Sequence, residues 1–322
     1  MTLPLGRAMR EVFGETVSEL ADTNPRIVML DADVGSSTRA DIFEHRHPDR
    51  YLQMGIAEQN MLGVAAGLAT TGLIPFVSTF VAFAVVRPLD QIRVLIAQTG
   101  LNVKITPGYA GLFTGVTGKT HLIVDDVSIM RAMPGMVTVC PADDIEAGQA
   151  LRWCASYHGP VYVRLVRDAT QRLFDGSYSF EFGRAVVVRD GRDVTLISTG
   201  TQTPRVVDAA ELLAIEGIEA HVLHVPTIKP LDVAAIVAAA DRTGCVVTVE
   251  EHTVIGGLGG AVAEALSEHR PTFVKRLGMQ DVFGESASNA ALLELYGLSA
   301  ARVSEQVATI CRTRGKEVAA QS

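Results

Sequence analysis

The stretch that decides the fold is Met54-Gly55-Ile56-Ala57-Glu58-Gln59-Asn60, which places one carboxylate in an apolar run where a strand pattern gives way to a helical one. After it, apolar residues recur at helical spacing, at Met61, Leu62, Ala65 and Leu68. Glu58 is therefore predicted to lie in the first turn of a helix over residues 58–70. A buried acid must be compensated, so Glu58 either favours the helix dipole or faces a cleft.

Two further segments follow this stretch. The first is Ser78-Thr79-Phe80-Val81-Ala82-Phe83, and the second is the glycine-rich loop Gly108-Tyr109-Ala110-Gly111-Leu112-Phe113-Thr114-Gly115-Val116-Thr117-Gly118-Lys119-Thr120-His121. Phe80 and Phe83, three residues apart, fit one side of a short helical or irregular segment. Such a pair is either ordinary core or a flat apolar surface for a ring.

Length and charge limit the kind of partner. The chain has 322 residues, which is enough for two domains of ordinary size, each with its own core. Its formal net charge is -8, and no block of like charges marks a tail. These features argue against nucleic-acid binding. The expected partner is a small molecule or another protein.

Cysteine usage and hydropathy indicate the compartment. Four cysteines stand far apart with no C-x-x-C pair, so neither a zinc site nor a redox dithiol is predicted. The first ten residues contain no hydrophobic core of signal-peptide length. The longest apolar stretch, residues 73–86, is shorter than the roughly 18–20 residues that a membrane helix needs. We expect a soluble, cytoplasmic protein with no membrane contact.

The first half of the chain alternates short apolar runs with helical patterns, which is typical of an α/β domain with a mostly parallel sheet and helices on both faces. The predicted strands are 27–30, 75–77, 103–105, 136–139 and 161–166. The predicted helices are 10–21, 58–70, 81–98, 125–133 and 143–156, the last with Asp143 as its N-cap.

The periodicity disappears between Gln171 and Gly183, which we interpret as a linker between a domain over residues 1–180 and a second α/β domain over residues 184–322. In the second domain, strands are predicted at 186–188, 194–198, 220–224, 245–250 and 272–276, and helices at 204–216, 231–240, 256–268, 285–296 and 299–312. The run Gly256-Gly257-Leu258-Gly259-Gly260 is a weak nucleotide-loop signal, so we interpret it as a tight turn with close helix packing.

The order of the motifs around Glu58, Phe80 and the glycine-rich loop resembles the pyrimidine-binding half of transketolase. The second domain, with Glu250-Glu251-His252 and its glycine turn, resembles the transketolase C-terminal domain. This resemblance implies thiamine diphosphate as cofactor. It also implies that Glu58 bonds the aminopyrimidine ring nitrogen, that Phe80 and Phe83 stack on the ring, and that Asp33 lies near it. Such a carboxylate drives formation of the cofactor's internal base, so Glu58 is a predicted catalytic residue.

The resemblance also implies a substrate site. Arg10, Ser37 and Arg167 match positions that bind a sugar phosphate, and guanidinium groups suit phosphate oxygens, although isolated arginines usually form surface ion pairs. His121 matches a histidine that contacts a substrate oxygen and assists proton movement, so it is a second predicted catalytic residue. Tyr109 and Thr117 are predicted substrate-binding residues that replace a histidine and an aspartate of many transketolases. These two departures are compatible with a modified sugar.

One family signature is missing: no Gly-Asp-Gly followed by a later Asn, which holds magnesium and the diphosphate, occurs in the chain. No metal ligand is therefore predicted here, and both the metal and the diphosphate are expected on an N-terminal transketolase subunit, in an α2β2 assembly. The leading hypothesis is the C-terminal subunit of a split transketolase that transfers a two-carbon ketol unit. The alternatives are a subunit of a decarboxylating thiamine enzyme, similar to 1-deoxyxylulose-5-phosphate synthase or a 2-oxo-acid dehydrogenase beta subunit, and a non-catalytic regulatory subunit.

Overall fold

A seven-stranded sheet forms the centre of the first half of the chain in a computed structural model that describes residues 3–321, without the side chains of residues 115 and 315–321. In sheet order its strands are β12 (Thr227–Lys229), β6 (Val137–Val139), β7 (Val161–Val163), β5 (Lys104–Ile105), β4 (Ile74–Ser78), β2 (Ile27–Asp31) and β3 (Tyr51–Gln53). All pair in parallel except β12, which is antiparallel to β6. Every residue of β2 and β4 is buried, as expected for parallel strands covered on both faces.

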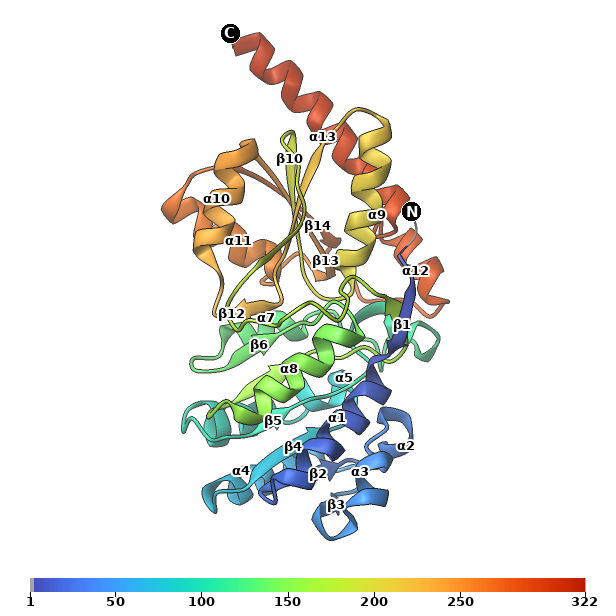
Figure 1. Cartoon of the computed structure of the whole chain (residues 1–322), viewed down its shortest axis with the longest axis vertical. Coiled ribbons are helices and arrows are strands. Elements are labelled where there is room, and N and C mark those ends of the chain that lie inside the picture. The colour runs from blue at the N-terminus through green and yellow to red at the C-terminus, as the bar shows by residue number, and fades with distance from the viewer. Residues whose placement is uncertain (1–2, 322) are drawn as a thin grey trace.

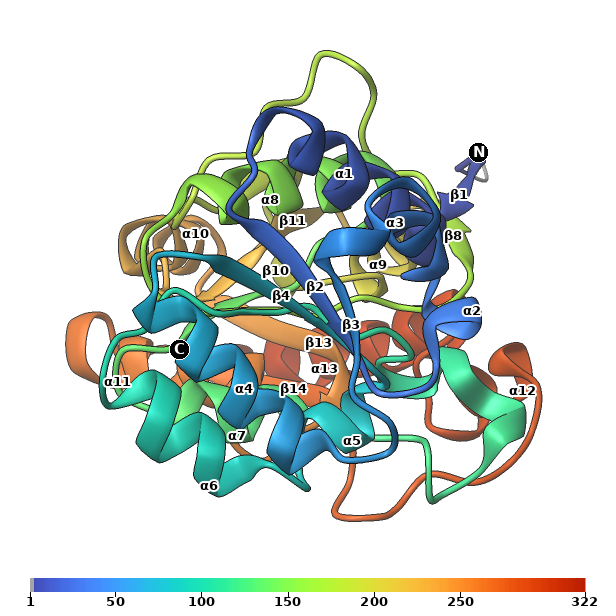
Figure 2. The same ribbon diagram turned by 90° about the horizontal axis from the view of Figure 1, so that it is seen from below.

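Helices cover both faces of this sheet. Figure 2 shows α1 (Met9–Thr23), α3 (Asp41–Arg46) and α8 (Asp144–Ser156) on one side of β2 and β4, and α4 (Glu58–Thr70) and α7 (Asp126–Ala132) on the other. Asp143 caps α8 as predicted, since its carboxylate accepts a hydrogen bond of 2.9 Å from the Glu146 N–H.

The predicted single helix over residues 81–98 is wrong. The chain instead forms α5 (Val81–Val85), a turn at residues 86–88, α6 (Leu89–Gln91) and a π-helical segment, Ile92–Ala97. Pro88 explains the interruption, because its ring removes a backbone donor and disfavours helical geometry at Arg87. Helix α5 therefore ends early, and Arg87 lies in a turn.

Several short elements have too little periodicity to be predicted from sequence. They are β1 (Leu5–Ala8), which pairs antiparallel with β8 (Ala169–Gln171), together with α2 (Gly35–Thr38), the 3-10 turns Pro48–Arg50 and Gly111–Thr117, and strands β3 and β12. The 3-10 turn at residues 111–117 lies within the glycine-rich loop.

A second, five-stranded sheet organises the rest of the chain, with the order β14 (Phe273–Met279), β13 (Cys245–Thr253), β10 (Val194–Ser198), β11 (Ala220–His224) and β9 (Val186–Arg189). Only β9 is antiparallel. Helices α10 (Val233–Thr243) and α11 (Leu258–His269) cover one face, and α9 (Gln202–Ile215), α12 (Asn289–Leu295) and α13 (Ala300–Gln321) cover the other (Figure 1). The predicted helix over 285–296 begins only at residue 289, where the Ser288 hydroxyl caps it.

The predicted fold class is confirmed: two α/β domains, each with a mostly parallel sheet between helices. Strand β12 lies in the second half of the sequence but pairs with β6 at the edge of the first sheet. The first sheet therefore contains strands from both halves of the chain (Figure 1). Within the described residues, no helix combines the length and the apolar character needed to cross a membrane.

Candidate active site

Glu58 begins α4, as predicted, and is the buried acid of the site with 4% of its surface exposed. Ala57 precedes it and supplies no side-chain cap, so the carboxylate lies where the helix dipole favours a negative charge. Its Oε1 atom accepts a hydrogen bond of 2.8 Å from Nη1 of Arg87. The carboxylate is thus shielded from water and paired to one arginine.

Arg87 was missed by sequence reasoning. It lies in the turn before Pro88, and its guanidinium stands over the Phe83 ring, 4.1 Å from the ring centroid. Gln59 ties this turn to α4, since its side-chain amide donates to the Arg87 carbonyl at 3.1 Å. The available signal was an arginine directly before a proline inside an apolar run.

The predicted aromatic residues meet beside Glu58. Phe80 and Phe83 are stacked with centroids 5.8 Å apart, and Tyr109 stacks on Phe80 with centroids 3.9 Å apart. His121 contacts Phe83 edge-on at 5.1 Å, while its Nδ1 atom pairs with the Thr120 hydroxyl at 2.8 Å. A backbone bridge between Phe80 and Gly108 brings the glycine-rich loop next to the end of β4. The structure therefore joins four predicted residues into one aromatic cluster.

Of the predicted arginines, Arg167 contacts this cluster, whereas the described contacts join Arg10 only to Ser37. Arg167 donates from Nε to the Tyr109 hydroxyl at 2.9 Å and pairs with Asp168 at 2.7 Å. Arg10 donates from Nη1 to the Ser37 carbonyl at 3.2 Å, and its buried Nε atom has no partner among the described residues. A buried guanidinium N–H without an acceptor costs free energy unless a ligand supplies one.

Two predicted residues, Asp33 and Thr117, contact residues outside the aromatic cluster. Asp33 is exposed in the turn after β2, with a φ of 60°, and its backbone N–H donates to Gln53 Oε1 at 2.9 Å. Thr117 is exposed, and its hydroxyl pairs with that of Thr114 at 2.6 Å. The described contacts do not join either side chain to the other predicted site residues.

Asp31 is a second buried carboxylate that sequence reasoning missed. It is fully buried at the end of β2, and burial raises its pKa although it accepts hydrogen bonds from Gln53 and from the Val34 and Gly35 N–H groups. It orders the turn that carries Asp33, and a strand-end acid before a turn is the signal that could have identified it.

The glycine-rich loop is held from the second domain. Glu251 Oε1 accepts a hydrogen bond of 2.6 Å from the Leu112 N–H, and a Cβ on Gly111, which has a φ of 60°, would overlap that oxygen. Farther along the loop, Lys119 pairs with Glu285 at 2.7 Å, and the Ser286 hydroxyl donates to the Val116 carbonyl at 3.1 Å. Residues 111–121 are thus a bridge between the two domains.

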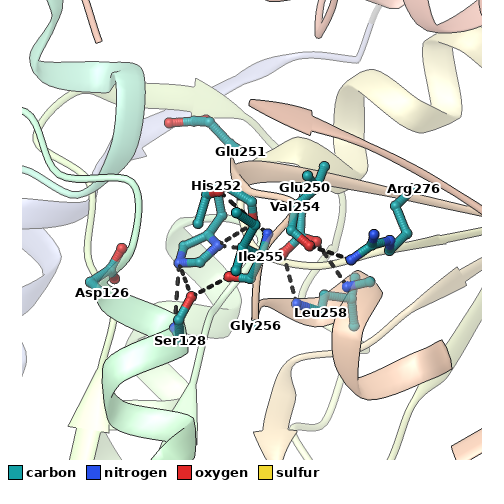
Figure 3. Close-up of polar contacts among 12 residues, drawn as sticks. Asp126, Ser128, Glu250, Glu251, His252, Val254, Ile255, Gly256, Leu258 and Arg276 are labelled. Carbon is teal, nitrogen blue, oxygen red and sulfur yellow. Dashed lines mark hydrogen bonds and ion pairs between the residues drawn. The ribbon is translucent and has the colours of Figure 1, made fainter. Parts of the chain in front are cut away.

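A second polar cluster lies where α7 meets the end of β13 (Figure 3). Glu250 accepts hydrogen bonds from the Leu258 and Gly259 N–H groups at 2.7 and 2.8 Å, which caps α11. A Cβ on Gly257 would overlap the Glu250 carboxylate, so the glycine run makes the tight turn that was predicted. Burial raises the pKa of Glu250 to about 7 and lowers the pKa of the neighbouring His252 to about 4.

Glu58 and the aromatic cluster together fit a flat heteroaromatic ring with an N–H donor, because they offer one shielded carboxylate acceptor beside stacked phenyl rings. The second cluster has no aromatic surface and its carboxylate is saturated by backbone donors, so it is structural. Among the described residues, no group of three or more His, Cys, Asp or Glu side chains is placed to bind a metal ion.

Comparison with known proteins gives two family matches. The transketolase pyrimidine binding domain matches residues 6–172, and the transketolase C-terminal domain matches residues 183–303. A putative transketolase C-terminal section of Methanocaldococcus jannaschii is 41% identical over 94% of this chain and 95% of its own length. A 6-deoxy-6-sulfo-D-fructose transketolase subunit of a Clostridium species is 41% identical over 92% of each chain.

One relative and two solved structures agree with these matches. An apulose-4-phosphate transketolase subunit of Phocaeicola vulgatus is 36% identical over 90% of this chain and 93% of its own. A solved split-gene transketolase, described as an inactive beta4 tetramer, superposes with a TM-score of 0.86 at 44% identity, over 94% of this chain and 98% of its own. A Leishmania mexicana transketolase, at 24% identity and a TM-score of 0.81 over 97% of this chain and 47% of its own, shows the shared fold.

Proposed function

The chain belongs to the transketolase family, and from that premise we propose that it is the C-terminal subunit of a split, thiamine-diphosphate-dependent transketolase. In this proposal it transfers a two-carbon ketol unit from a ketose to an aldehyde acceptor. The observation that carries the proposal is the buried Glu58 carboxylate beside the stacked rings of Phe80 and Phe83. Relatives that match over nearly their whole length are transketolase sections or subunits.

Glu58 and the residues of the aromatic cluster have different roles in this proposal. Glu58 would hydrogen-bond the ring nitrogen of the aminopyrimidine and favour its protonated, N–H-donating form, and Phe80 with Phe83 would support the ring. When bound, thiamine diphosphate supplies an acidic carbon that becomes a nucleophile toward a carbonyl group. His121 contacts Phe83, and it moves a proton to or from the substrate oxygen. Asp33, exposed in the turn after β2, would contact the cofactor when it is bound.

The diphosphate and Mg²⁺ must be held by a partner that carries the diphosphate-binding domain. Ile56 and Val86, neighbours of Glu58 and Arg87, are 74% and 53% exposed. Such apolar side chains at the mouth of the site suit a subunit interface. The similar split-gene transketolase is described as inactive in its beta4 form, which supports the need for an N-terminal subunit. An α2β2 assembly in the cytoplasm is our proposal for the active form.

The substrate is proposed to be a sugar that carries an anionic group. Arg167 and Arg10, whose Nε atom lacks an acceptor among the described residues, offer guanidinium donors for that group. The relatives named for 6-deoxy-6-sulfo-D-fructose and for apulose 4-phosphate act on a sulfonated and a phosphorylated sugar. Ser37, Tyr109 and Thr117 contact the sugar and its hydroxyl groups.

The test is reconstitution of this chain with its N-terminal partner, followed by assays of ketol transfer from phosphorylated and sulfonated ketoses. Glu58→Ala and the isosteric Glu58→Gln are expected to lower kcat by orders of magnitude, because the cofactor can no longer be activated. Circular dichroism of both variants verifies folding. Unchanged activity in Glu58→Ala would refute the catalytic role, release of CO₂ from a 2-oxo acid would identify a decarboxylating enzyme, and an inactive wild-type complex would favour a regulatory subunit.

A further inference from the structure

Arg87 makes two contacts of the kind that a flat ligand would make at this site. Its guanidinium carbon lies over the Phe83 ring, 4.1 Å from the centroid, and its Nη1 atom donates to Glu58 Oε1 at 2.8 Å. One planar group therefore covers an aromatic face and satisfies a buried carboxylate at the same time.

We propose that Arg87 occupies the aminopyrimidine place when no cofactor is bound, and that the cofactor must displace it. This inference rests on the proposed function. An aminopyrimidine is also planar and stacks on aromatic rings, and with its ring nitrogen protonated it donates an N–H to a carboxylate. The two groups compete for the same face of Phe83 and the same oxygen of Glu58.

The structure explains both why the arginine is held and why it can leave. Glu58 is 4% exposed, so an unpaired carboxylate there would be costly, and Arg87 pairs with it. The Arg87 side chain is itself 46% exposed and lies in the turn forced by Pro88, outside any helix. It can swing into water without breaking a helical hydrogen bond or opening the core.

The pairing also has the strength expected of a displaceable contact. The cation of the pair, Arg87, is 46% exposed and keeps much of its hydration, and contacts made by such exposed cations are weak. Only the molecules in which Arg87 leaves the site open can bind the ligand. The apparent Kd is therefore the intrinsic Kd divided by the fraction of open molecules. Removing the arginine side chain is therefore expected to tighten cofactor binding about three- to tenfold.

The first test is calorimetric titration of thiamine diphosphate with Mg²⁺ into the complex of this chain with its partner. Arg87→Ala should lower the apparent Kd about three- to tenfold, and Arg87→Lys, which still pairs with Glu58, should stay near wild type. Arg93→Ala is the matched control, because Arg93 is also exposed but lies within the π-helical segment. An unchanged or higher Kd in Arg87→Ala would overturn the inference.

A second test needs no partner and separates this inference from the proposed function. Binding of 4-amino-5-hydroxymethyl-2-methylpyrimidine to the full chain alone is measured by saturation-transfer NMR. Arg87→Ala should give a stronger signal than wild type, and the double variant Glu58→Ala/Arg87→Ala should give none. A wild-type complex without cofactor binding would refute the proposed function. Equal or absent fragment binding by wild type and Arg87→Ala would refute the displacement.

Discussion

At the scale of single residues, Arg167 is the side chain whose removal best tests the anionic substrate. Its Nε atom bonds the Tyr109 hydroxyl at 2.9 Å, which orients the guanidinium beside the aromatic cluster. A hydrogen bond to a charged group contributes about 1.5–3 kcal/mol, so Arg167→Met should raise KM for an anionic ketose at least about tenfold. The value of kcat should change little. Steady-state kinetics of the reconstituted enzyme gives both values.

Tyr109→Phe is the matched variant for this prediction. It removes only the hydroxyl that accepts from Arg167 and keeps the ring stacked on Phe80. Its KM should rise about two- to threefold, which corresponds to less than 1 kcal/mol. A ketose without phosphate or sulfonate should react equally with wild type and Arg167→Met. If Arg167→Met raises KM for the neutral ketose as much as for the anionic one, Arg167 supports the fold of the site and does not bind the anionic group.

At the scale of elements, the turn that begins α11 contains two buried groups with opposite pH dependence. Burial raises the pKa of Glu250 to about 7, so its protonation stabilises the fold at low pH, and that stability is lost as the pH rises through about 7. Burial lowers the pKa of His252 to about 4, so its contribution is present above about 6.5 and is lost as the pH falls through about 4. The two effects oppose each other between these limits.

Removing one group should expose the effect of the other. Relative to wild type, His252→Asn should gain stability as the pH falls from about 6.5 to 4.5, and Glu250→Gln should lose stability over the same range. Each difference is limited to about 3 kcal/mol by shifts of this size. Urea unfolding at a series of pH values measures both. Parallel curves for the three proteins would show that neither group titrates inside the folded structure.

Helices and caps were predicted correctly where a local sequence signal is strong. The helix over 58–70 and the Asp143 cap follow from apolar spacing and from a side chain that bonds its own turn. It failed where one proline outweighs a long apolar run, because Pro88 divides the segment 81–98. The position of Arg87 over Phe83 depends on that turn, so periodicity could not reveal it. Strand β12 was missed for another reason: three residues carry no pattern, and only the neighbouring β6 makes them a strand.

At the scale of the whole molecule, the second domain takes part in shaping the site. The described residues of this domain lie outside the aromatic cluster. Glu251, however, reaches across the domain junction to the Leu112 N–H, and its other oxygen lies 3.3 Å from the Thr201 hydroxyl and 3.5 Å from Arg205. The conformation of the loop that carries Tyr109, Thr117 and His121 therefore depends on how the two domains dock.

Glu251→Ala should release this loop while leaving Glu58, Phe80 and Phe83 in place. The Leu112 N–H loses its acceptor, and the buried Arg205 loses its partner carboxylate. Hydrogen exchange of the Leu112 amide and its neighbours in the loop should accelerate, and kcat/KM of the reconstituted enzyme should fall about tenfold, the effect of roughly one such hydrogen bond. The Kd for thiamine diphosphate should stay within about twofold, because Glu58 is held by α4, and Phe80 and Phe83 by the start of α5, in the first domain. Glu251→Gln keeps an acceptor oxygen for Leu112 and should remain near wild type in loop exchange. If Glu251→Ala leaves exchange of the loop unchanged, the loop is ordered by the first domain alone, and the junction contributes stability without setting the geometry of the site.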